Sequence, residues 1–75
     1  MKITYDAEAD TLYIELHPLA PGTAHTRDLT EEVVADYGPD GKLAGLEILD
    51  ASNVLGKEPQ RLVLEVAPLL AAKIA

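Results

Sequence analysis

The chain has 75 residues, a net charge of −7 and no cysteine. This length accommodates one small domain, and the lack of thiols excludes disulfides, thiolate metal sites and a cysteine nucleophile. The acidic excess and the scattered lysines and arginines disfavour binding to nucleic acid or to an anionic membrane surface.

Two strands are predicted at the start of the chain. Residues 2–5 and 11–17 alternate apolar and polar side chains, which is the period of a strand with one buried face. The largely acidic residues 6–10 between them predict a tight polar turn. Pro18 and Pro21 then end the second strand and begin a loop.

Three further strands are predicted in the middle of the chain. Residues 23–29 are rich in threonine and predict an edge strand. Residues 31–37 and 43–49 predict a hairpin, because the Gly-Pro-Asp-Gly sequence at 38–41 is a strong turn signal. Gly45, inside the last of these strands, indicates a bulge or a close approach of the backbone. The short connections favour an antiparallel meander.

The C-terminal part is predicted to begin with a short helix that Asp50 caps and Gly56 ends. Beyond it, the alternation over residues 61–66 favours a strand, followed by a short helix that begins at residue 68 or 69. One helix throughout residues 60–74 is the alternative, because apolar residues also recur there at helical spacing. This apolar tail either packs on the sheet or exchanges with a second chain.

The predicted fold is a single α+β domain over residues 1–75. It consists of a small antiparallel β-meander of four to five strands, a short helix and an apolar C-terminal strand or helix segment. No apolar run approaches the length of a membrane span and no signal-peptide pattern is visible, so we expect a cytoplasmic protein.

Two segments carry motifs whose order and spacing match those of a known family. They are Tyr5-Asp6-x-Glu8-x-Asp10-x-Leu12-Tyr13-Ile14 and Asp40-Gly41-x-x-x-Gly45-x-Glu47-Ile48-Leu49-Asp50-Ala51-Ser52. Over about residues 3–55 the chain resembles the small bacterial family called domain of unknown function 2283. The resemblance implies a compact β-meander followed by a short helix, and it implies no activity. It also implies an antitoxin-like role, because members are suspected partners of small toxins.

The acidic turn is the first candidate metal site. Asp6, Glu8 and Asp10 have the spacing that opens a calcium-binding loop. Such a loop also needs glycine and glutamate at two later positions, where this chain has Thr11 and His17. The favoured interpretation is that these carboxylates accept hydrogen bonds from the amides of the turn.

The two histidines are the second candidate metal site. His17 and His25 flank a loop and can approach each other if their strands form a hairpin, with Glu15 or Asp28 as a third ligand. Surface positions for both histidines are the favoured alternative. We therefore expect no bound metal and no cofactor.

Side chains for catalysis are sparse. Asp36 and Glu47 can face each other on adjacent strands and divide acid and base roles, but solvated or charge-paired carboxylates are the commoner outcome. Ser52, the single serine, has no histidine in sequence context to activate it. No glycine-rich phosphate loop is present in the sequence. We therefore expect no enzymatic activity.

These observations predict a non-enzymatic protein-interaction module that self-associates, because a chain this short gains buried surface by forming a homo-oligomer. Its acidic surface would neutralise a basic protein partner, as in an antitoxin-like component, and an exposed strand edge would assist. The candidate contact residues are Glu31, Glu32, Asp36, Leu62, Leu64 and Leu69. The alternative is a small metal- or ligand-binding domain with weak or no catalytic activity.

Overall fold

The computed structural model describes residues 1–61, apart from the side chain of Gln60. The strand predicted at 61–66 lies outside the described residues except for Arg61, which belongs to a short helical turn. The helix predicted after that strand lies wholly outside them, as does all but the start of the helical alternative over 60–74.

Five strands precede two short helical segments. The elements are β1 (Lys2–Asp6), β2 (Thr11–Glu15), β3 (His25–Asp28), β4 (Val33–Tyr37), β5 (Leu43–Ile48), the α-helix α1 (Ala51–Val54) and the 3₁₀ turn η1 (Pro59–Arg61). All five predicted strands are therefore confirmed, with ends that differ by a few residues. None of the helices within the described range is long and apolar enough to cross a bilayer.

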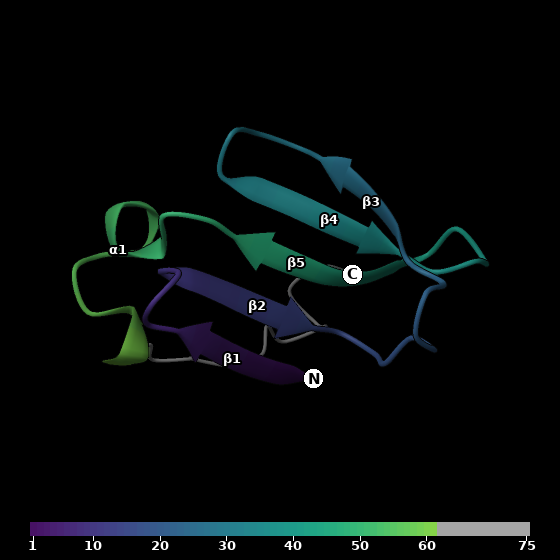
Figure 1. Cartoon of the computed structure of the whole chain (residues 1–75), viewed down its shortest axis with the longest axis horizontal. Coiled ribbons are helices and arrows are strands. Elements are labelled where there is room, and N and C mark those ends of the chain that lie inside the picture. The colour runs from purple at the N-terminus through teal and green to yellow at the C-terminus, as the bar shows by residue number, and fades with distance from the viewer. Residues whose placement is uncertain (62–75) are drawn as a thin grey trace, which may run out of the picture.

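The strands form one antiparallel sheet in the order β1-β2-β5-β4-β3 (Figure 1). The predicted meander is correct for the β1–β2 hairpin and for β3–β4–β5, but it is wrong for the sheet as a whole. After β2 the chain runs through residues 16–24 to the far edge, so that β5 pairs with β2. The residue composition explains this order, because β3 has no apolar side chain to bury and suits an edge.

The strand register gives the sheet one apolar face and one polar face. Directly opposite residues share a face, and the register places Ile14 opposite both Ile3 and Leu46, and Ile48 opposite Val33. The other face carries polar side chains from all five strands, among them Thr4, Tyr13, Glu47, Asp36 and Thr26. The predicted alternation is therefore confirmed, and the two faces have different chemistry.

The buried core of the described chain is small. Its buried hydrophobic side chains are Leu12, Ala35, Ala44 and Ala51, of which only Leu12 is large. Helix α1 lies at one end of the sheet, and within residues 1–61 no layer of structure covers the apolar face (Figure 1). The radius of gyration, 14.7 Å, exceeds the roughly 11 Å of a compact chain of this length. Most large apolar side chains of this face are half-buried.

Candidate functional site

Asp10 is the centre of a hydrogen-bond cluster that joins the β1–β2 turn to the start of α1. Its Oδ1 accepts a hydrogen bond from the Tyr5 hydroxyl at 2.7 Å, and its Oδ2 accepts one from the Ser52 hydroxyl at 2.6 Å. The backbone amide of Ser52 also donates to Oδ1 at 3.1 Å, and the amide of Ala51 donates to the Asp10 carbonyl at 2.9 Å. We call Tyr5, Asp10 and Ser52 the Asp10 cluster. It attaches the helix to the sheet.

The helix cap predicted for Asp50 is wrong in its chemistry. Asp50 occupies the N-cap position, but its side chain makes no capping hydrogen bond and its backbone is left-handed, with φ at 53°. The carboxylate of Asp10, 40 residues earlier in the chain, binds the free amide of Ser52 instead. Asp10 is itself left-handed, with φ at 52°, and this conformation is one that aspartate tolerates better than most residues.

The hydrogen bonds of the Asp10 cluster shift two ionisation equilibria. The donors on Ser52 and Tyr5 stabilise the charged carboxylate and lower the pKa of Asp10 below its usual value, against an opposing contribution from desolvation. The same bond raises the pKa of Tyr5, because ionising its hydroxyl would remove the donor and place two negative charges together. Asp10 is therefore held as an ionised acceptor and Tyr5 as a protonated donor.

A second network crosses the polar face from β2 to β3. The Tyr13 hydroxyl donates to Asp36 Oδ2 at 2.9 Å, and the Thr26 hydroxyl donates to Asp36 Oδ1 at 3.0 Å. To reach Asp36 on β4, the Tyr13 ring passes over Gly45 of β5, where an added Cβ would lie 2.7 Å from the Tyr13 Cζ. Gly45 was predicted to mark a bulge or a close approach of the backbone. The β4–β5 pairing does shift register next to it, between Asp36 and Tyr37, but the group that lies over Gly45 is the Tyr13 ring.

Burial raises the pKa of Tyr13 to about 12, with further contributions from its hydrogen bond to Asp36 and from that carboxylate's charge. Both oxygens of Asp36 accept a hydrogen bond, one from Thr26 on the neighbouring strand β3 and one from Tyr13 on β2, beyond β5. The less favoured possibility that Glu47 and Asp36 face each other is wrong, because Glu47 lies opposite Val34 and Asp36 lies opposite Gly45. The network therefore links strands across the sheet and does not form a carboxylate pair.

The candidate metal ligands do not converge. Asp6 Oδ1 accepts hydrogen bonds from the amides of Glu8 and Ala9 at 3.0 and 3.2 Å, as the turn interpretation predicts, whereas Asp10 points into its own cluster. His17 and His25 do not face each other across a hairpin, because β5 and β4 lie between their strands. Across residues 1–61, no group of three or more histidine or acidic side chains is placed to hold a metal ion.

The predicted contact residues divide into three groups. Glu31 is exposed and Glu32 half-exposed in the turn between β3 and β4. Asp36 is half-buried and both of its oxygens are engaged by Tyr13 and Thr26. The apolar tail residues Leu62, Leu64 and Leu69 lie outside the described residues.

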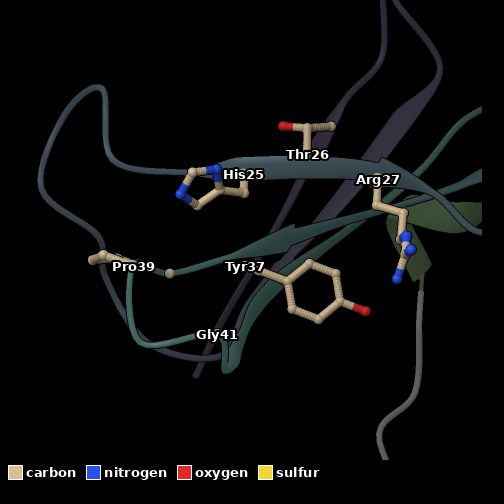
Figure 2. Close-up of a pocket in the computed structure, with 7 residues that line it drawn as sticks. His25, Thr26, Arg27, Tyr37, Pro39 and Gly41 are labelled. Atoms are coloured by element: carbon tan, nitrogen blue, oxygen red, sulfur yellow. The ribbon is translucent and has the colours of Figure 1, made fainter.

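An open hollow of about 460 Å³ at the β3 edge is a feature that the sequence did not reveal. Its walls come from β3, from Tyr37 at the end of β4 and from the turn that follows. Figure 2 shows the side chains of Arg27 and Tyr37 on one side of the strands and that of Thr26 on the other. No carboxylate among residues 1–61 forms an ion pair with Arg27. The sequence feature that could have indicated this hollow is the spacing of His25 and Arg27, two residues apart on a predicted edge strand.

Comparison with known proteins gives one result. The chain matches the family model described as "Protein of unknown function (DUF2283)" over residues 2–52. No curated protein and no solved structure gives a significant match. The matched range contains both sequence motifs, the whole Asp10 cluster and the whole network around Asp36. This chain therefore belongs to the DUF2283 family.

Proposed function

We propose that this protein is a non-enzymatic protein-interaction module that self-associates. The observation that carries the proposal is the apolar face of the sheet, which no second layer covers within residues 1–61. Stable domains bury an apolar sheet face against a further layer. A short chain readily gains such a layer from another polypeptide.

A non-enzymatic role is supported by the way the polar groups are used. Asp10 and Asp36 both accept hydrogen bonds on their two carboxylate oxygens, and the donors belong to their own chain. These bonds join the strands to one another and to α1. Carboxylates whose oxygens are already engaged serve the fold, and little is left to transfer a proton to a substrate.

An antitoxin-like role is the heterologous form of the same proposal. The net charge of −7 suits a basic protein partner, and Glu31 and Glu32 present carboxylates at the turn after β3. To test it, the tagged chain is used as bait in an extract of its source cells. We expect a stoichiometric basic protein that is retained by the wild type and released by the double variant Glu31→Lys/Glu32→Lys. Equal retention by both would contradict the electrostatic contact.

The test of self-association is sedimentation equilibrium of the full chain over a wide range of protein concentration. We expect a reversible dimer or higher oligomer, with a melting temperature that rises with protein concentration because assembly stabilises the folded state. A monomer at every concentration, with a concentration-independent melting temperature, would overturn self-association.

Ligand binding is a second candidate function, which the hollow at the β3 edge supports. Arg27 provides a guanidinium there, and His25 and Tyr37 provide further donors, a set that suits a small anion. Titration with inorganic phosphate and with citrate, followed by amide chemical shifts, tests this candidate. We expect shifts at β3 that Arg27→Ala abolishes and that the remote control Lys57→Ala retains. Shifts that are absent, or equal in both variants, would remove this candidate.

A further inference from the structure

Strand β1 forms one edge of the sheet, and within residues 1–61 it pairs only with β2. Its outer side offers backbone donors and acceptors to another strand. We propose that β1 pairs in antiparallel register with β1 of a second copy of this chain, centred on Thr4. This inference rests on the proposed self-association and assigns its contact surface.

The geometry of a symmetric edge contact selects this register. A twofold axis normal to the sheet keeps each face on its own side, so opposite residues must point to the same face. Because β1 has five residues, pairing centred on its middle residue engages the whole strand. Thr4 then lies opposite Thr4 of the partner subunit. Ile3 lies opposite Tyr5 of the partner subunit, an aliphatic–aromatic pair on the apolar face.

The charges of β1 are complementary in the same register. Lys2 lies opposite Asp6 of the partner subunit, and the twofold axis creates this pair twice. Both side chains are exposed on the polar face. The turn amides bind Asp6 Oδ1, which leaves Oδ2 as an acceptor. Lys2 is opposite Glu15 in its own sheet but forms no ion pair with it within 4 Å.

The opposite edge of the sheet does not offer this match. Strand β3 has four residues, so its full self-pairing would be centred between Thr26 and Arg27 and would put opposite residues on different faces. One allowed register puts Arg27 opposite Arg27 of the partner subunit, and like charges directly opposite are destabilising. The other puts His25 opposite Arg27 of the partner subunit and brings no acidic side chain opposite a basic one. The two edges therefore differ, and β1 is the one that accepts a second copy.

Pairing at β1 has a consequence for the apolar face. The two copies form one continuous sheet with five strands from each, and both apolar faces lie on the same side. The dimer would thus present one wide apolar surface. A partner, or a segment of the chain outside residues 1–61, then packs on it as the second layer.

Single-cysteine cross-linking reads the register directly, because the wild type has no cysteine. In the proposed dimer the two copies of residue 4 have Cα atoms about 4.5–5.5 Å apart, within the range of about 4.4–6.8 Å that a disulfide spans. The two copies of residue 2 are four positions apart along the strands, about 13 Å. We expect mild oxidation to convert full-length Thr4→Cys to a covalent dimer and to leave the matched control Lys2→Cys monomeric under denaturing conditions.

Charge reversal provides an independent measurement. Lys2→Glu and the control Lys42→Glu make the same change in net charge, and both positions are exposed. Only Lys2→Glu places like charges opposite each other in the dimer. We expect its dimer dissociation constant, from sedimentation equilibrium, to rise about tenfold or more relative to that of Lys42→Glu.

The outcomes separate this inference from the proposed function. A dimer that shows selective Thr4→Cys cross-linking and selective weakening by Lys2→Glu supports both. A dimer in which Lys2→Cys cross-links as readily as Thr4→Cys, or in which the two charge variants dissociate alike, overturns the β1 contact and leaves self-association standing. A chain that is monomeric at every concentration overturns both.

Discussion

Gly45 and Tyr13 depend on each other at the scale of single residues. The Tyr13 ring occupies the space above Gly45, and a Cβ there would also lie 3.2 Å from the backbone oxygen of Ile14. We expect Gly45→Ala to displace the ring, break the hydrogen bond to Asp36 and destabilise the fold by about 1–3 kcal/mol. Urea unfolding checks this value. In a Tyr13→Leu background, Gly45→Ala should lower the unfolding free energy by less. Equal losses in both backgrounds would contradict the steric explanation.

The raised pKa of Tyr13 makes a prediction for alkaline pH. Its hydroxyl ionises near pH 12 in the folded chain, above the ordinary value of 10.0. Stability from this group is complete below pH 10 and is lost as pH rises from there through 12. Absorbance titration of phenolate should show one tyrosine ionising near pH 12, and Asp36→Asn should move it to lower pH. A titration unaffected by that substitution would contradict the assignment to Tyr13.

The lowered pKa of Asp10 makes the matching prediction for acid. Its folded pKa lies below the ordinary value of 3.8, so its contribution to stability is present above that pH and is lost as pH falls through the folded pKa. Asp10→Asn keeps a side chain that tolerates the left-handed backbone but removes the charge. We expect the gap in melting temperature between wild type and variant to be constant at neutral pH and to narrow on acidification below pH 4. A difference in melting temperature that stays constant at every pH would contradict the lowered pKa of Asp10.

At the scale of elements, α1 depends on a strand turn distant in sequence. Ser52→Ala removes the hydroxyl that donates to Asp10, and we expect it to cost about 1 kcal/mol, as the loss of a capping bond does. Asp50→Gly should be neutral or slightly stabilising, because glycine adopts a positive φ without strain and Asp50 does not cap the helix. Chemical denaturation of both variants measures the two losses of unfolding free energy, and we expect the loss to be larger for Ser52→Ala. A larger loss for Asp50→Gly would restore Asp50 as the cap.

Four of the strands were largely predictable because their alternation identifies a buried face, whereas the fully exposed β3 was predicted from its threonine content. The order of the strands in the sheet was not predictable, because alternation shows which side chains are buried and does not show which strands pair with each other. Asp50 shows the same limit for the helix. An acidic residue just before the helix is the usual local cap, whereas here the tertiary structure brings Asp10 to that amide. Local rules did predict the role of Asp6, whose hydrogen bonds are all within its own turn.

At the scale of the whole molecule, the two faces of the sheet should respond differently to the same substitution. Val33 and Val34 are adjacent and half-buried, and they point to opposite faces. If a second layer covers the apolar face in the assembled protein, Val33→Lys buries a charge and should cost about 1–2 kcal/mol. Val34→Lys lies on the polar face and should cost less than about 0.5 kcal/mol. Urea unfolding of both variants checks the difference, and equal costs would argue that the apolar face stays in water.

The sequence alone determined the class of this protein: a small acidic α+β domain, its strands, its turns and its family. These follow from local periodicity, turn chemistry and motif spacing, each of which is contained within a few consecutive residues. The tertiary structure decided the strand order, the cap of α1 by Asp10, the tyrosine ring over Gly45 and the identity of the two edges. These depend on which distant residues meet, and hydrogen bonds and steric exclusion act only between groups that the fold has brought into contact.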